Sequence, residues 1–204
     1  MHASPSPFPD SAEAESDRAL VERARRDPEA FGALFERHFD AIFGYVHRRT
    51  GDWDAARDLT SEVFLKALRS LWRYRWTGVP FSSWLYSIAT NELRMYFRRR
   101  RRAPGALDEL FPAGLPAADP AALLAERERA EHAEELAHDF VRVREALGRL
   151  PAKYQEAIAL RYFEEKSVAE VAAILGKREG TVKSLLSRGV ARLRALLPPP
   201  GATR

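Results

Sequence analysis

The chain has 204 residues, of which 46% are hydrophobic, carries a formal net charge of +4 and contains no cysteine. The lack of cysteine excludes disulfides and thiolate metal sites, and it fits a cytoplasmic location. No stretch approaches the roughly 18 consecutive apolar residues that a membrane span requires, so we expect no such span.

The charge is unevenly distributed along the chain. Residues 1–103 hold 18 basic and 14 acidic residues, residues 104–139 hold 2 and 9, and residues 145–204 hold 11 and 6. Two basic blocks therefore flank an acidic one. Such blocks are typical of a polyanionic partner such as duplex DNA, although an unevenly charged solvated surface explains the composition equally well.

The first part of the chain changes character at Asp27. Residues 1–17 are rich in serine, proline and acidic residues, and we expect them to be disordered. Asp27-Pro28 is typical of a helix start, because Asp can cap the helix and Pro fits its first turn. Apolar residues then recur at spacings of three and four over residues 31–46, and we expect Gly51 to end this helix.

Two further helices follow. Asp52 can cap the second, whose apolar positions repeat with helical spacing over residues 56–71. A segment containing Gly and Pro separates it from the third helix. We expect the third helix to be capped by Ser82 or Ser83 and to end in the five successive arginines at residues 98–102.

The chain then passes through a segment that cannot form one continuous helix. Prolines and glycines recur between residues 103 and 120, so we interpret residues 104–139 as an acidic, flexible interdomain linker. A second compact region covers residues 140–197, and residues 198–204 form a tail. Because no strand alternation is found, the predicted fold is all-α, with two small helical domains at residues 18–103 and 140–197.

The strongest local signal lies in the second domain. Ser167 and Glu170 have the spacing of a capping box, and Gly176 is placed to end the short helix that the box begins. A second helix follows with one apolar face and one face of cations and hydroxyls. An ordinary helix pair explains the box alone, but the three features together favour a DNA-binding helix-turn-helix.

These residues resemble a known family. The stretch GTVKSLLSRGVARLRALL at residues 180–197 is similar to the promoter-binding region of the extracytoplasmic-function (ECF) sigma factors of the sigma-70 superfamily. Two N-terminal stretches are similar to the same family, namely DLTSEVFLKAL at residues 58–68 and FSSWLYSIATNELRMYFRRRRR at residues 81–102. Both blocks occur in the family's order, with a variable linker between them.

The resemblance implies both a fold and a function. Residues 18–103 would form sigma region 2 and residues 140–197 sigma region 4. The protein would be a sigma factor, not an enzyme, that binds core RNA polymerase and directs promoter-specific initiation and DNA opening. Its partners would be core RNA polymerase, promoter DNA and an anti-sigma factor. We expect no cofactor, metal or small-molecule substrate.

Three sets of residues are expected to carry these activities. The set for binding core polymerase is Asp58, Ser61, Glu62 and Leu65. The set for reading and melting the minus-ten element is Trp72, Tyr74, Trp76, Ser87, Asn91, Arg94 and Arg98. The set for binding the minus-35 element is Thr181, Lys183, Ser184, Ser187, Arg188 and Arg192.

Side-chain chemistry supports these sets to different degrees. Aromatic residues interleaved with arginines at residues 72–76 suit stacking on unpaired bases, although core aromatics beneath a loop explain them too. Asn91 can pair with a base edge, and Arg188 with guanine. Without the resemblance, the polymerase set would be interpreted as a solvated face with a surface pair between Glu62 and Lys66.

The sequence departs from the family's usual pattern at three positions. The family usually has Glu where Arg57 stands and Gln where Ser61 stands, and it often has Asp where Met95 stands. These differences concern individual contacts with polymerase and with the minus-ten element, not membership of the family.

Two other classes of protein were compared with this interpretation. A stand-alone helix-turn-helix regulator would explain residues 150–197 but would leave the N-terminal block without a role. A metal-dependent nuclease could use Asp54, Asp58 and Glu62, yet the sequence shows no converging histidine and no phosphate-binding or nucleophile motif.

Overall fold

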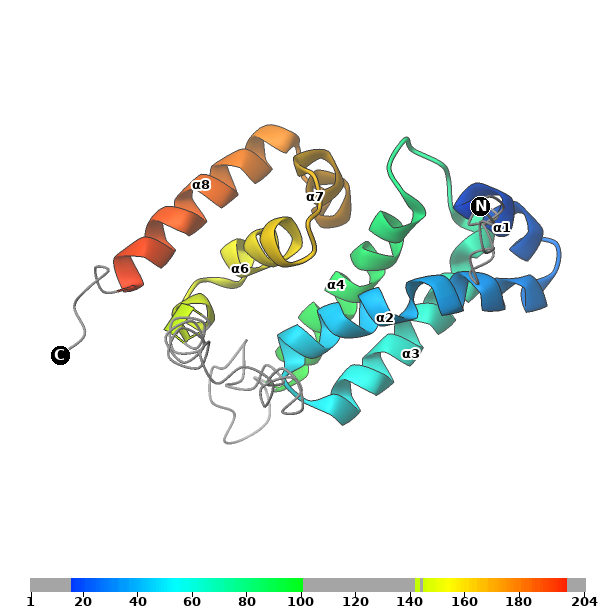
Figure 1. Cartoon of the computed structure of the whole chain (residues 1–204), viewed down its shortest axis with the longest axis horizontal. Coiled ribbons are helices and arrows are strands. Elements are labelled where there is room, and N and C mark those ends of the chain that lie inside the picture. The colour runs from blue at the N-terminus through cyan, green and yellow to red at the C-terminus, as the bar shows by residue number, and fades with distance from the viewer. Residues whose placement is uncertain (1–15, 101–141, 144, 198–204) are drawn as a thin grey trace, which may run out of the picture.

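The computed structural model describes residues 16–100, 142–143 and 145–197, and every regular element among them is helical (Figure 1). The all-α fold is thereby confirmed. The expected linker at residues 104–139, the tail at residues 198–204 and nearly all of the expected disordered N-terminus lie outside the described residues.

The helices form two groups, which we call the N-terminal module (residues 16–100) and the C-terminal module (residues 142–143 and 145–197). The N-terminal module contains α1 (Asp17–Ala24), η2 (Pro28–Ala30), α2 (Phe31–Thr50), α3 (Trp53–Ser70), η3 (Leu71–Arg73) and α4 (Phe81–Arg100). The C-terminal module contains α6 (Ala152–Ile158), the π-helical turn η5 (Ala159–Phe163), α7 (Val168–Leu175) and α8 (Glu179–Leu196). Helices α2, α3 and α4 pack on one another, α1 packs on α2, and α6 and α7 both pack on α8.

The predicted end of α2 and start of α3 are confirmed. Gly51 ends α2 in the left-handed conformation, with a φ of 64° that glycine adopts without steric cost. The carboxylate of Asp52 accepts a hydrogen bond of 3.0 Å from the amide of Ala55 and so caps α3. Asp27 caps the short turn η2, and α2 itself begins at Phe31.

Helix α1 lies partly within the segment that was expected to be disordered. It begins at Asp17, and the hydroxyl of Ser16 accepts a hydrogen bond from the amide of Ala19 as its cap. Leu20 and Val21 are buried against the rest of the module. A helix of eight residues has few apolar positions, so its periodicity is a weak signal in the sequence.

Helix α4 begins earlier than predicted. Its first residue is Phe81, so neither Ser82 nor Ser83 precedes the helix as a cap. Ser83 is instead buried, and its hydroxyl donates a hydrogen bond of 3.4 Å to Glu170 of the C-terminal module. The predicted cap at Ser82 or Ser83 is therefore wrong, and Ser83 instead makes a contact between the two modules.

Hydroxyl groups tie α2 to α4 inside the N-terminal module. Tyr45 of α2 is fully buried, and its hydroxyl lies 3.0 Å from that of Thr90 of α4. The ring of Tyr86 packs edge-on against Tyr45, with 5.1 Å between the ring centroids. Buried hydroxyls need such partners, so these contacts fix the rotation of α4 and thereby which side chains it exposes.

The helix-turn-helix signals are observed in the C-terminal module. The Ser167 hydroxyl accepts from the amide of Glu170 at 3.2 Å, and the Glu170 carboxylate accepts from the amide of Ser167 at 2.9 Å. Gly176 then ends α7 with a φ of 62°. Burial alone would raise the pKa of Glu170, but its hydrogen bonds from Ser167 and the nearby Lys166 together lower it.

The two modules contact each other. Helix α7 packs against α4, and Figure 1 shows α7 beside α4 and α8 farther from it. The face of α4 that meets α7 therefore lies between the two modules.

Candidate nucleic-acid interface

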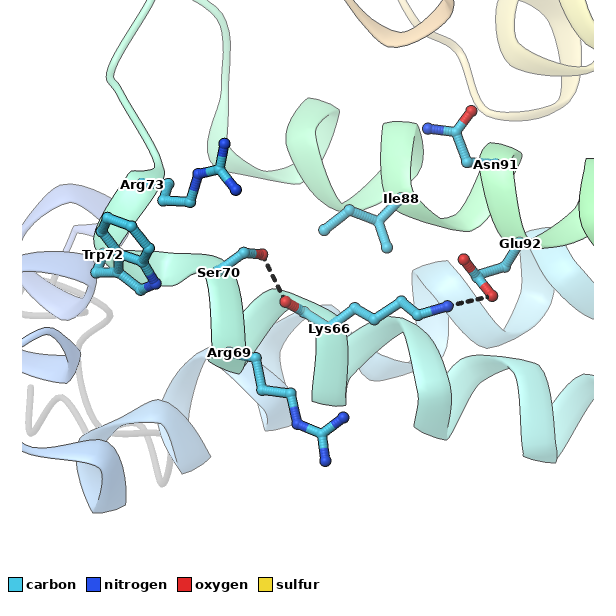
Figure 2. A pocket seen from close by; sticks show the side chains of 8 residues that line it. All are labelled: Lys66, Arg69, Ser70, Trp72, Arg73, Ile88, Asn91 and Glu92. Atoms are coloured by element: carbon cyan, nitrogen blue, oxygen red, sulfur yellow. Dashed lines mark hydrogen bonds and ion pairs between the residues drawn. The ribbon is translucent and has the colours of Figure 1, made fainter.

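An open groove of about 520 Å³ lies where the end of α3 meets α4 (Figure 2). Its lining residues are Lys66, Arg69, Ser70, Trp72, Arg73, Ile88, Asn91 and Glu92. Figure 2 shows Trp72 and Arg73 at one end and Asn91 and Glu92 at the other. The groove thus combines an aromatic ring, three cations and an amide, which are the groups that bind unpaired nucleotides.

Ion pairs order one wall of this groove. The ammonium of Lys66 lies 2.7 Å from a carboxylate oxygen of Glu92 and 3.2 Å from one of Glu62. The hydrogen bond with Glu92, more than any other contact, raises the pKa of Lys66 above its usual value. Lys66 therefore remains a cation, and it links α3 to α4 across the groove.

The segment between α3 and α4 presents two of its three aromatic residues to solvent. Trp72 is 71% exposed and Trp76 is 44% exposed. Tyr74 is instead buried, and its ring packs against Phe81 and Trp84 at centroid distances of 5.3 and 4.9 Å. The prediction that Tyr74 stacks on DNA is corrected to a core role, because its ring is not available at the surface.

Helix α1 supports this segment through Arg25. The guanidinium of Arg25 donates to the backbone carbonyl of Leu71 at 3.4 Å and to that of Tyr74. An ion pair with Glu22 at 2.7 Å also holds the guanidinium in place. These hydrogen bonds fix the backbone on both sides of Trp72, so α1 positions the exposed aromatic ring.

The predicted polar stripe of α4 is present but only partly free. Asn91 and Arg98 are exposed. The hydroxyl of Ser87 donates to the carbonyl of Trp84 at 2.6 Å, within its own helix. Arg94 donates to Asn91 at 3.1 Å and also pairs with the C-terminal module, as described below.

Helix α8 presents the expected polar face. Thr181, Lys183, Ser187, Arg188 and Arg192 are exposed, and Ser184 is partly exposed. Arg188 donates to the Ser184 hydroxyl at 2.7 Å and to the Ser184 carbonyl at 3.2 Å. The guanidinium of Arg192 instead lies 5.0 Å from the ring centroid of Tyr154, over the ring face.

The predicted polymerase-binding residues form an exposed ridge on α3. Asp58 and Ser61 are exposed, Leu65 is 40% exposed, and Glu62 is half-buried in its pair with Lys66. The hydroxyl of Ser61 donates to the carbonyl of Arg57 at 3.0 Å, so it is satisfied within its own helix. An exposed apolar side chain one turn from an acidic one suits a protein partner.

No three His, Cys, Asp or Glu side chains among the described residues converge as a group that could hold a metal ion. No described helix is both long and apolar enough to cross a membrane.

Comparison with known proteins identifies the family. Residues 34–103 match the description "Sigma-70 region 2", and residues 140–193 match "Sigma-70, region 4". The chain belongs to the ECF sigma factors of the sigma-70 family. Both modules of this sigma factor therefore have a family counterpart, and the alternative of a stand-alone helix-turn-helix regulator is not favoured.

Relatives of this sigma factor extend over most of the chain. The ECF RNA polymerase sigma factor BldN of Streptomyces coelicolor is 35% identical over 91% of this chain and 69% of BldN. The RNA polymerase sigma-H factor of Pseudomonas aeruginosa is 31% identical over 91% of this chain and 95% of that protein. The structure of CnrH in complex with the cytosolic domain of CnrY has a TM-score of 0.62 at 26% identity, over 89% of this chain and 97% of that one.

Arg73 belongs to the predicted pattern of aromatic residues and arginines at residues 72–76, but Lys66 and Arg69 were not predicted to line the groove of this sigma factor. Lys66, Arg69 and Arg73 follow one another at spacings of three and four, so they share a side of α3 and its continuation into η3. That spacing could have indicated that all three line one surface. Arg25 gave no such signal, because its contacts with Leu71 and Tyr74 span 46 and 49 residues of sequence.

Proposed function

We propose that this sigma factor engages promoter DNA through two surfaces and core RNA polymerase through a third. The groove between α3 and α4 takes unpaired bases of the minus-ten element. The polar face of α8 binds the minus-35 element in the major groove. The α3 ridge of Asp58, Ser61, Glu62 and Leu65 docks on core polymerase.

The observation that carries this proposal is that one groove is lined by Trp72 at one end and Asn91 at the other, with Lys66, Arg69 and Arg73 as its cations. A base extruded from the duplex loses its stacking neighbours, and an exposed indole replaces them at about 1–3 kcal/mol per base. The amide of Asn91 can then pair with a base edge, and the neighbouring arginines can neutralise phosphates. Promoter opening needs this combination of groups.

Each DNA surface is small, so each is expected to bind weakly by itself. Few phosphates are contacted at either surface, and salt ions compete for them. Core polymerase would hold both modules over one promoter at once and so raise their effective concentrations. Because bacterial polymerase and chromosome share the cytoplasm, this function also places the protein there.

An anti-sigma factor is a further proposed partner. The related structure of CnrH contains the cytosolic domain of CnrY. A regulatory protein of this kind would need to cover the α3 ridge or the α4 groove to block the activity proposed above.

The test is run-off transcription from genomic fragments with purified core polymerase, with and without this protein. We expect promoter-dependent transcripts, and permanganate-reactive thymines within the opened region. Trp72→Ala is expected to reduce opening by roughly fivefold to 150-fold, from the loss of about 1–3 kcal/mol of stacking, while Trp72→Phe retains most of it. DNA binding without any stimulation of core polymerase would instead favour the stand-alone regulator.

A further inference from the structure

Three carboxylates of the C-terminal module reach across to the N-terminal module. Their contacts run along α4 in reverse order: Glu170 meets Ser83, Glu164 meets Tyr86, and Glu156 meets Arg94. Because the order along one module is the inverse of that along the other, the contacts define a single docked arrangement and not scattered encounters.

The pair between Glu156 and Arg94 has the geometry of a strong charge-assisted contact. The Nε of Arg94 donates to one oxygen of Glu156 at 2.8 Å, and an Nη donates to the other at 2.7 Å. The Glu156 side chain is 8% exposed, whereas that of Arg94 is 41% exposed. This hydrogen bonding, before any other effect, raises the pKa of Arg94. A fork of this kind fits phosphate as well as carboxylate.

Glu164 makes a second set of contacts. Its carboxylate accepts from the Nε of Arg48 at 3.1 Å and from the hydroxyl of Tyr86 at 2.8 Å. Burial, and then the charge of Glu164, raise the pKa of Tyr86, so its hydroxyl remains protonated and donates. The ammonium of Lys166 lies 4.7 Å from the Tyr86 ring centroid.

The charges explain why this docking can be reversed. In the docked arrangement the Glu164 side chain is 4% exposed and that of Glu156 is 8% exposed, and the cost of keeping these charges from water offsets much of their attraction to the arginines. Separation of the modules returns water to all four charged groups. DNA phosphates or a polymerase surface can therefore displace the carboxylates without a large energetic cost.

We propose that region 4 is an intramolecular competitor of DNA, in which Glu156, Glu164 and Glu170 dock on α4 and occupy Arg94 in place of a phosphate. The consequence for DNA rests on the proposed function of the α4 surface, whereas the docking itself does not. Region 4 leaves its own α8 face exposed in this state, so only the minus-ten surface is masked. Assembly with core polymerase, which holds the modules apart, exposes Arg94.

The docking is tested by a distance measurement in the full-length protein. Because the chain has no cysteine, Asp40→Cys on α2 and Ala191→Cys on α8 introduce two unique, exposed sites for spin labels. We expect a narrow distance distribution by electron–electron resonance. Adding Glu156→Gln and Glu164→Gln is expected to broaden it toward longer distances. A broad distribution without these changes, or an unaltered one with them, would overturn the proposal.

The competition is tested by the affinity of the free protein for fluorescent single-stranded DNA of mixed sequence, about 15 nucleotides long. Glu156→Gln is expected to raise the affinity roughly threefold to tenfold, since the open fraction rises. Glu145→Gln is the matched control, because it removes the same charge from an exposed site of region 4. Equal effects of the two variants would refute competition at Arg94.

Transcription by the assembled holoenzyme separates this proposal from the proposed function. Glu156→Gln is expected to leave run-off transcription at the wild-type level, because the contact is already broken in the assembly. If the wild-type protein itself supports no transcription, the proposed function fails, while the distance distribution still reports whether the modules dock. Loss of transcription in Glu156→Gln alone would overturn the assignment of Glu156 to the free state.

Discussion

At the scale of single residues, α8 holds Arg188 and Arg192, two of its exposed arginines, in different ways. Arg188 is bonded to the hydroxyl and carbonyl of Ser184, both on the polar face, so its guanidinium is ordered near the expected DNA. Arg192 lies over the ring of Tyr154, which draws its charge toward the protein. The structure therefore favours Arg188 over Arg192 as the residue that reads a base.

Arg188→Ala is accordingly expected to weaken promoter binding by the holoenzyme by about 1–3 kcal/mol and to relax selectivity at one minus-35 position. Arg192→Ala is the comparison and should cost less, with no change in sequence preference. Binding measured on a set of single-base promoter variants checks both points. Wild-type selectivity in Arg188→Ala would contradict the assignment.

A second residue-scale prediction concerns His38. Burial lowers the pKa of His38, although Asp17, whose carboxylate lies 3.1 Å from the ring, acts in the opposite direction. The unfolded chain then binds the proton more readily than the folded one, so stability falls as pH drops below about 6.5. As the pH is lowered from about 7.5 to 5.5, thermal unfolding should show a smaller loss of stability for His38→Gln than for the wild type. The same dependence of stability on pH in both proteins would contradict this role of His38.

At the scale of elements, the sequence predicted those boundaries that local chemistry determines. Gly51, Asp52 and the capping box at Ser167 each act within four residues of themselves, so their signals are visible in the sequence. The core position of Tyr74 could not be predicted in this way, because only the packing of α4 decides which of three alternating aromatic residues turns inward.

Substituting alanine for each of two glycines of α8 is expected to change the stability of the protein in opposite directions. A Cβ at Gly189 would lie 3.0 Å from the end of Ile158 and 3.3 Å from the Cβ of Tyr154, whereas one at Gly180 would meet nothing within 4 Å. Gly189→Ala should therefore destabilise the protein by about 1 kcal/mol, because overpacking outweighs the gain in helix propensity. Gly180→Ala should stabilise it by up to about 1 kcal/mol. Denaturant unfolding measures the change in the free energy of unfolding for both variants. A change of the same sign in the two would contradict the close approach of α6 and α8.

The support that α1 gives to the aromatic segment is also testable. Arg25→Met keeps the length of the side chain but leaves the carbonyls of Leu71 and Tyr74 without its hydrogen bonds, a loss of about 1–3 kcal/mol in local stability. We expect slower promoter opening by permanganate reactivity, with unchanged affinity for core polymerase. Glu22→Gln removes only the ion pair with Arg25 and should have a smaller effect.

At the scale of the whole molecule, the sequence indicated two modules but not their docking. Helical periodicity reports which face of a helix is buried, not which distant helix covers it. The pairs that join the modules, such as Arg48 with Glu164 and Arg94 with Glu156, lie 116 and 62 residues apart. A lone arginine or glutamate on a half-polar helix is indistinguishable in sequence from a solvated one, so the masking of Arg94 required the structure.

The acidic segment between the modules acts through its charge in this prediction, because residues 104–139 lie outside the described residues. With 9 acidic and 2 basic residues, the segment opposes the net positive charge of the blocks on either side. Neutralising Asp108, Glu109, Asp119, Glu126 and Glu128 should raise the affinity of the free protein for DNA several-fold at about 0.05 M salt.

Screening provides the decisive control for that prediction. Since charges separated by more than about 10 Å are largely screened at 0.1 M salt, the gain should shrink steeply as salt rises. A shuffled segment of the same composition keeps its charge and should bind DNA as the wild type does. The distance between labels at residues 40 and 191 should not change, because the docking contacts of Glu156 and Glu164 remain. An affinity that stays constant at low salt would show that the segment does not restrain DNA binding.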